Sequence, residues 1–75
     1  MPLPTEKIVK GTVCLFTGAL HVSASGLAGT GRHLTREKVR ITRVLPGYAH
    51  PVLLGDGNTD QLGWAHPDDL DELGH

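Results

Sequence analysis

Glycine and proline interrupt this chain so often that little room remains for a long helix. Its 75 residues include ten glycines and five prolines, and both residue types favour turns over regular helix. No segment between them repeats its apolar residues with a sustained helical period, as a helix with one buried face would. The sequence therefore predicts an all-β protein built from short strands and frequent turns.

The clearest strand lies in residues 34–45, which read LTREKVRITRVL. Val39 and Ile41 alternate there with charged and polar residues, as expected for a strand with one buried face. The alternation slips at the adjacent Val44 and Leu45. The Pro-Gly pair that follows then ends the strand, because proline has no N–H group to donate to a sheet.

Three shorter runs also have the composition of strands: residues 11–18, 50–57 and 60–66. In the first run, we expect Cys14 and Phe16 on one face of the strand, with Val13 and Leu15 on the other. The second run ends at the sequence GDGN, which favours a hairpin turn because glycine, aspartate and asparagine tolerate positive φ.

Two segments fall outside these strands. Residues 18–34 are rich in glycine, serine and alanine, so we expect a long loop or an irregular hairpin there. The sequence HPDDL at 66–70 favours one 3₁₀ or α turn before a final strand, with Leu70 and Leu73 packed on the core. Together the elements describe a small SH3-like barrel of about five to six short strands, with a long early loop and one short 3₁₀ turn near the C-terminus.

The chain length favours one small domain, which we place at residues 8–75, with residues 1–7 as a linker. A domain of this size buries only about 60–65% of the surface that its unfolded chain exposes, which leaves little room for a catalytic cavity. The single cysteine, Cys14, excludes an internal disulfide and a multi-cysteine zinc site. It lies in an apolar run and is expected to be a small buried hydrophobic residue. No apolar run is as long as a membrane span.

Charge is distributed unevenly along the chain, although the net charge at pH 7 is only −1. Five of the seven basic residues lie within 32–43, and six of the eight acidic residues lie within 56–72. The fold could carry one basic and one acidic side, or both groups could be ordinary solvated faces. Arg36, Lys38 and Arg40 are expected to share one face of their strand. The net charge and the low aromatic content disfavour RNA binding.

Five sequence motifs follow one another along about residues 8–73: KGTVCLFTGA, a glycine- and serine-rich loop, VRITRV, PVLLG and GWAHPDDL. In this order they resemble the bacterial SH3-like (SH3b) domains that bind cell walls in phage endolysins and other peptidoglycan hydrolases. The resemblance implies a non-catalytic module that binds a peptidoglycan peptide, a glycan or an associated polymer such as teichoic acid. It also implies an attached hydrolase domain, action at the cell wall, and no cofactor.

The candidate ligand contacts are ring-bearing and loop residues: Tyr48, His50, Trp64, His21, Ser23 and Ser25. Tyr48 lies in an expected turn, where a large ring has no role in the core, and His50 follows close behind it. Trp64 begins an expected strand, and it is either a residue at the edge of the core or an exposed platform for the ligand. With the loop from His21 to Ser25, these rings would hold an extended peptide or sugar in a shallow groove.

Neither a catalytic site nor a metal site is expected. The five histidines lack the close pair spacing of zinc sites, and Cys14 lies in apolar surroundings that would raise its pKa. Asp68 and Asp69 are adjacent and would point apart, whereas hydrolases need carboxylates that face each other. The capping and dipole of a short helical turn explain the two aspartates better.

Two other functions fit a small chain of this kind. One is a protein–protein or assembly module that uses an exposed strand edge and forms a weak homo-oligomer. The other, less favoured, is RNA or DNA binding through the strand within residues 32–43. Wall binding, stable self-association and salt-dependent binding of nucleic acid distinguish the three functions.

Overall fold

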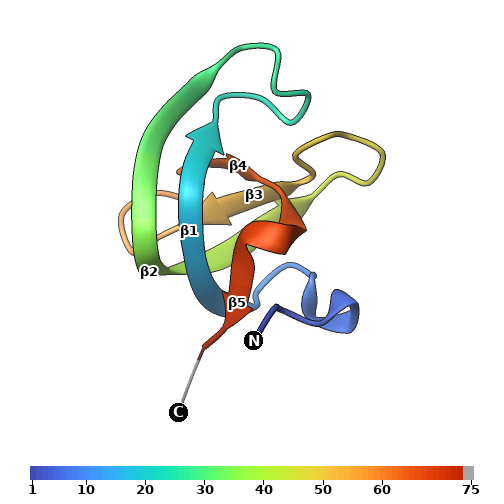
Figure 1. Cartoon of the computed structure of the whole chain (residues 1–75), viewed down its shortest axis with the longest axis vertical. Helices are drawn as coiled ribbons and strands as arrows, with labels where there is room; N and C mark the ends of the chain where they lie inside the picture. The colour runs from blue at the N-terminus through green and yellow to red at the C-terminus, as the bar shows by residue number, and fades with distance from the viewer. Residues whose placement is uncertain (74–75) are drawn as a thin grey trace.

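The chain folds as one antiparallel sheet with two short 3₁₀ turns and no α-helix in residues 1–73, the part that the computed structural model describes (Figure 1). The elements in chain order are η1 (Thr5–Lys7), β1 (Val13–His21), β2 (Thr30–Val44), β3 (Val52–Gly55), β4 (Gly63–Ala65), η2 (Pro67–Asp69) and β5 (Leu70–Glu72). The predicted all-β class and the 3₁₀ turn near the C-terminus are confirmed. Within these residues, no helix has the length and apolar character needed to cross a membrane.

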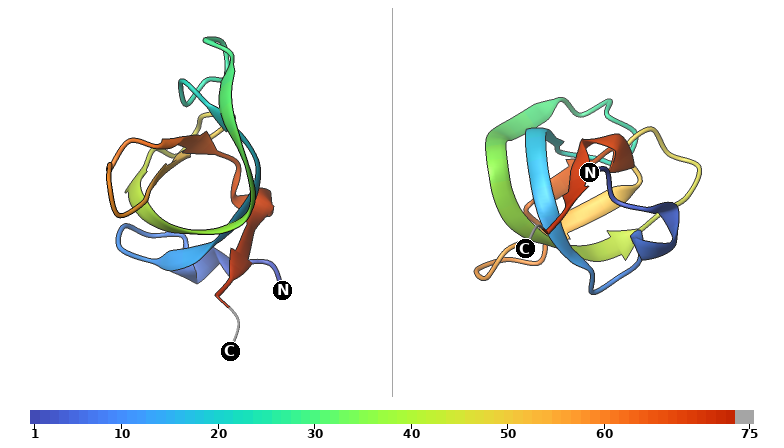
Figure 2. Two further views of the ribbon diagram at one scale, coloured as in Figure 1. Left: turned by 90° about the vertical axis from the view of Figure 1, so that its left-hand side faces the viewer. Right: turned by 60° about the horizontal axis from the view of Figure 1, so that its bottom comes forward.

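Strand pairing links β1 through β4 in a closed circuit. The order in the sheet is β2-β3-β4-β1-β5, and β2 also pairs with β1. One registered pair completes the circuit, His21 of β1 with Trp64 of β4. Figure 2 shows the strands curving around a common interior, with β5 beside β1.

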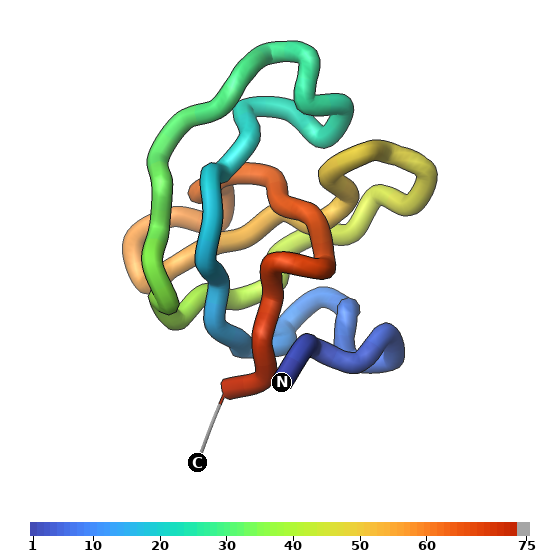
Figure 3. Tube along the Cα trace, viewed as in Figure 1, coloured from blue at the N-terminus to red at the C-terminus, as the bar shows by residue number. Residues whose placement is uncertain are grey.

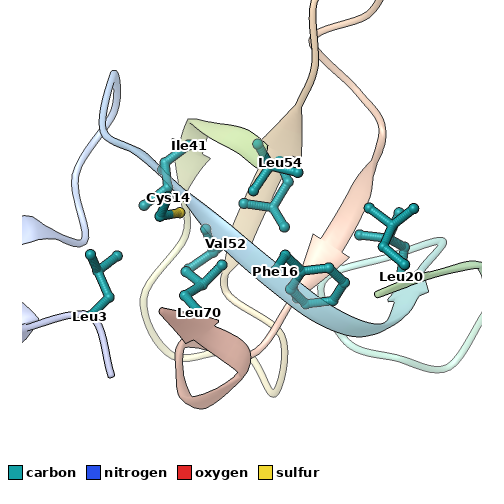
Figure 4. Packing of buried hydrophobic residues seen from close by; sticks show 11 residues of the cluster. Leu3, Cys14, Phe16, Leu20, Ile41, Val52, Leu54 and Leu70 are labelled. Carbon is teal, nitrogen blue, oxygen red and sulfur yellow. The ribbon is translucent and has the colours of Figure 1, made fainter. Parts of the chain in front are cut away.

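Apolar side chains from the strands and the N-terminal segment fill this interior (Figure 4): Leu3, Cys14, Phe16, Leu20, Leu34, Val39, Ile41, Val52, Leu54, Ala65 and Leu70. The alternation predicted for β1 is confirmed, because Cys14 and Phe16 face the core while Val13 is exposed. Burial raises the pKa of the Cys14 thiol to about 11. Leu70 is buried as predicted, but the prediction for Leu73 was wrong, since it lies beyond the end of β5 and stays exposed.

A bulge in β2 changes which side chains face outward near the end of the strand. Ile41 pairs with Leu54 and Arg43 pairs with Leu53, so Thr42 and Arg43 together lie opposite one residue of β3. The extra residue turns the Arg43 side chain to the outer face of the sheet. Without it, strict alternation would direct Arg43 toward the core.

The bulge is stabilised by the hydroxyl of Thr42. This oxygen lies 2.7 Å from the carbonyl oxygen of Asp60 and 3.2 Å from that of Leu53, and it donates toward both. Beyond the bulge, Val44 packs against the core. The predicted slip in alternation therefore exists, but it begins at Thr42 and not at Val44.

The predicted loop over residues 18–34 is mostly strand, which corrects the expectation of a long early loop and of uniformly short strands. β1 continues to His21 and β2 begins at Thr30, so the connection spans only residues 22–29. The β1–β2 register has two irregularities in this region. The two irregularities break the alternation of side chains between the faces of the sheet, but the backbones of β1 and β2 stay paired.

Of residues 1–7, which the sequence suggested as a linker, residues 1–3 lie along β5 (Figure 3) and residues 5–7 form η1. The N–H of Leu3 donates to the carbonyl of Leu70 at 3.0 Å, and the N–H of Glu72 donates to the carbonyl of Met1 at 2.9 Å. The side chain of Leu3 is buried with the core. The N-terminal segment therefore covers the outer edge of the last strand.

Candidate functional site

Four side chains from four strands form a continuous row on the outer face of the sheet, which we call the outer row: Arg43, Leu53, Trp64 and His21. Each of these residues pairs with the next across neighbouring strands. Ala65, next to Trp64 in β4, is buried in the core, so alternation directs the indole outward. The outer row therefore sets a cation, an apolar side chain and two aromatic rings side by side.

Gly63 allows β4 to approach β1 closely enough to complete this row. A Cβ atom at Gly63 would lie 2.6 Å from the Cβ of Leu20, far inside the ordinary contact distance between carbon atoms. Glycine therefore permits the close strand approach at which His21 and Trp64 pair.

Trp64 is half-buried on this outer face. Its cross-strand neighbour Leu53 is only 8% exposed, even though Val52 and Leu54 on either side of it face the core. Leu53 lies between its cross-strand neighbours Arg43 and Trp64, and all three border the same depression. Trp64 thus combines the two roles considered for it: it lies at the edge of the core, and part of its ring is available to a ligand.

Three adjoining depressions meet at Arg43, and the first of them runs along the outer row. The first has a volume of about 310 Å³ and is also bordered by Trp64 and His21. The second, of about 400 Å³, is bordered by Arg40 and Lys10, and the third, of about 630 Å³, again by Lys10. We call them together the outer groove. Because all three open widely to solvent, the outer groove is a shallow trough.

The outer groove carries a surplus of positive charge. Lys10 is held beside β2 by two backbone hydrogen bonds between residues 11–12 and Ile41, with lengths of 2.7 and 2.9 Å. Asp60 is the acidic residue that borders the groove. Among residues 1–73, no carboxylate lies within ion-pair distance of the three cations of the groove.

Beside the outer row, the imidazole rings of His21 and His50 stack on each other. Their centroids are 3.5 Å apart and their planes are inclined by 14°. The backbone N–H of His50 donates to the carbonyl of Ala24 at 2.8 Å, which ties the loop before β3 to the loop after β1. Gly26 leaves room for the stack, because a Cβ atom there would lie 2.9 Å from Cδ2 of His50.

The surroundings of His50 favour its neutral form. Its pKa is lowered from the ordinary value of 6.5, first by burial and then by nearby His21 and His66, while Asp69 acts in the opposite direction. The Nδ1 atoms of both stacked rings are buried and have no hydrogen-bond partner within residues 1–73. Because a protonated imidazole carries N–H on both nitrogens, protonation of His50 would leave a charged donor at its Nδ1 without an acceptor.

The other predicted contact residues lie in the elements around this stack. Trp64 pairs with His21 across the strands. Ser23 and Ser25 belong to the loop after β1, where their hydroxyl oxygens are 3.1 Å apart. Tyr48 is 54% exposed in the loop that precedes His50. The structure thus joins the two histidines, the serine loop and Trp64, and it leaves the Tyr48 ring open to solvent.

The basic face predicted on β2 is regular only in part. Arg36 lies at an irregularity of the strand with a positive φ of 48°, so regular register is kept by Lys38, opposite Leu15, and by the residues after it. On the other side of β1, Asp71 of β5 also pairs with Leu15. The basic and acidic strands therefore flank the same strand of the sheet.

Sequence reasoning missed Arg43 and Lys10 as residues of the outer groove, and it predicted Arg40 only as part of a basic face of its strand. A signal for Arg43 was present, because a slip in alternation close to the end of a strand indicates a bulge, and bulges redirect side chains. Lys10 had no comparable signal. Its position depends on the pairing of residues 11–12 with Ile41, which is distant in the sequence.

Residues 1–73 contain no cluster of three His, Cys, Asp or Glu side chains suited to a metal ion. The lone pairs of the stacked histidines lie in nearly parallel ring planes, so they cannot converge on one ion. His66 caps η2, since its Nδ1 accepts a hydrogen bond from the N–H of Asp68 at 3.1 Å. Asp68 and Asp69 are exposed in the first turn of η2, where their negative charges interact favourably with the dipole of the turn.

Comparisons with protein-family models, with curated proteins and with solved structures found no match to this chain. What the surface can bind therefore follows from its chemistry. The outer groove offers a half-buried indole, an apolar floor and positive charge along an open trough. An open trough cannot enclose a compact ligand, as small-molecule sites do, but it can hold a length of polymer.

Proposed function

We propose that this chain is a non-catalytic SH3-like barrel that binds a polymer of the bacterial cell wall and targets a hydrolase to it. The observation that carries the proposal is the outer row, in which Leu53 lies between Trp64 and Arg43 along an open trough. The closed circuit of β1 through β4, with a 3₁₀ turn before the last strand, supports the barrel assignment.

In this proposal the ligand lies extended along the outer groove. The indole of Trp64 packs against the apolar face of a sugar or a peptide side chain, as aromatic rings with one open face do. Arg43 binds polar or charged groups of the next unit in the polymer. His21 borders the groove, and His50, Ser23 and Ser25 belong to the two tied loops next to His21. Tyr48 extends from one of these loops.

The shallowness of the groove implies modest affinity for each contact. Such a module gains effective strength from avidity, because a repetitive wall offers many sites and an attached hydrolase domain would supply further contacts. Targeting a hydrolase to the wall needs no catalytic residues on the module itself. It needs a surface that recognises a repeated chemical unit.

Sedimentation with purified bacterial cell walls tests the proposal. We expect the wild-type chain to sediment with walls and Trp64→Leu, which keeps an apolar side chain beside Leu53, to sediment several-fold less. Leu73→Ala, a change at an exposed apolar residue outside the outer groove, serves as the control and should bind as the wild type does. Absence of sedimentation with walls of every type tried would contradict the proposal.

The alternative of an assembly module that pairs through a strand edge gains no support from the arrangement of edges. Residues 1–3 cover the outer edge of β5. The part of β2 that pairs only with β1 carries Arg32, Arg36 and Lys38, and charged side chains oppose edge pairing. A stable homo-oligomer in light scattering, without wall binding, would favour this alternative.

A further inference from the structure

We infer that Arg43 makes the outer groove selective for a wall polymer that carries repeated phosphate groups. The inference rests on the proposed function, since it names the class of ligand that the same groove would take. The binding proposal requires only a polymer that fits the trough. Selectivity for phosphate requires a cation that borders the groove and is not already paired with a carboxylate.

The position of Arg43 meets this requirement. All three depressions of the outer groove are bordered by Arg43, so a polymer that follows the trough in any direction passes its guanidinium. The bulge at Thr42 is what turns this side chain outward, next to Leu53 and Trp64. A guanidinium presents a planar fork of donors that matches two phosphate oxygens at once.

The neighbouring charges favour a ligand with several negative groups. Lys10 and Arg40 border the second depression together with Arg43, and Asp60 is the one acidic residue described there. These cations are exposed and lack carboxylate partners within residues 1–73. A single exposed charge contact contributes little in water, so a polymer that meets several cations gains most.

The outer row also favours a phosphate polymer of sugars or polyols over a nucleic acid. Of the two aromatic rings in the row, His21 is stacked on His50, which leaves Trp64 as the ring available to a ligand, whereas proteins that bind single-stranded nucleic acid stack successive bases on several rings. The net charge of −1 and the acidic η2 and β5 oppose the long-range attraction of a nucleic acid.

Titration with purified poly(glycerol phosphate) tests the inference directly. The fluorescence of Trp64, the one tryptophan of the chain, reports binding at the groove itself. We expect saturable binding that weakens as salt is added, because exposed charge contacts are screened. Arg43→Gln should weaken binding about threefold to fivefold, the loss expected for one exposed charge contact.

Arg32→Gln is the matched control, because it removes the same charge from an exposed position of β2 that does not border the outer groove. Equal losses in Arg43→Gln and Arg32→Gln would overturn the inference, since general charge and not the site would then explain binding. It would also be overturned by an absence of binding to the phosphate polymer, or by equal or tighter binding of poly-glutamate or duplex DNA at matched charge concentration.

Sedimentation with two wall preparations separates this inference from the proposed function. Walls stripped of their phosphate polymers should retain less of the chain than intact walls do. Equal retention on both, without binding of poly(glycerol phosphate), would overturn the inference and leave wall binding standing. If neither preparation retains the chain, the proposed function fails, and the titration still decides the ligand class.

Discussion

The stacked rings of His21 and His50 join the end of β1 to the loop before β3 through a contact that suits a neutral His50. Of the groups around the pair, His66 disfavours protonation of His50 and Asp69 favours it. The loop over residues 22–29 and β4 contribute no titratable side chain. Two charged rings in face-to-face contact would repel each other.

Stability should therefore fall when the solution is acidified. Because the pKa of His50 is lowered in the folded chain, the unfolded chain binds more protons as the pH falls through about 6.5. The stabilising contribution is present above that pH and is lost as the pH falls toward the lower pKa of the folded state. Urea unfolding at a series of pH values measures this, and His50→Phe, which keeps a ring but cannot titrate, should show a smaller dependence. The same change at the exposed His33 should leave the wild-type dependence intact.

Gly26 and Gly29 provide a matched test of the space that the stack requires. Both have positive φ, 79° and 92°, so alanine at either position should cost about 1–2 kcal/mol in backbone strain. A Cβ at Gly26 would also meet the His50 ring, whereas one at Gly29 would meet nothing within 4 Å. We expect Gly26→Ala to lose about 1 kcal/mol more than Gly29→Ala in urea unfolding. Equal losses would show that the ring is not held against Gly26.

The hydroxyl of Thr42 should stabilise the fold and aim Arg43. Thr42→Val keeps the shape of the side chain but loses the hydrogen bonds to the carbonyls of Leu53 and Asp60, at a cost of about 1 kcal/mol. Binding of the wall polymer should weaken as well, because the bulge sets the direction of Arg43. Thr42→Ser retains the donor and should stay closer to the wild type in both measurements. A valine variant with unchanged stability and binding would rule out this role.

Gly63 should tolerate no side chain, because its missing Cβ makes room for Leu20. We expect Gly63→Ala to lose about 1–3 kcal/mol from overpacking and to shift Trp64 emission to longer wavelength as β4 moves away from β1. Gly57→Ala is the control, since a Cβ there meets nothing within 4 Å, and its effect should stay within about 0.5 kcal/mol. Similar effects of the two changes would contradict the close approach of β4 and β1.

The strands with regular alternation could be predicted from the sequence. The alternation at Val39 and Ile41 predicted β2, and that at Cys14 and Phe16 predicted the buried face of β1. The HPDDL sequence predicted η2. Residues 18–34 could not be assigned, because irregular register removed the alternation that reveals a strand. There the strands are held by backbone pairing, which leaves little trace in composition.

The candidate site was predictable in its residue types and not in its arrangement. His21, His50 and Trp64 were chosen for their rings and loop positions, and two of these rings stack while the third pairs with His21. Arg43 could not be assigned to the same surface, because its direction depends on a bulge opposite Leu53. Contacts set by register between distant strands require the fold itself.

The most direct test of the central claim is a residue-by-residue map of where the wall polymer binds, from amide and indole chemical shifts of the labelled chain titrated with wall fragments. Binding in the outer groove predicts shifts at Arg43, Leu53 and the Trp64 indole, with smaller shifts at β5 on another side of the molecule. Shifts confined to Asp71 and Glu72 of β5, or no shifts at saturating polymer, would contradict the account.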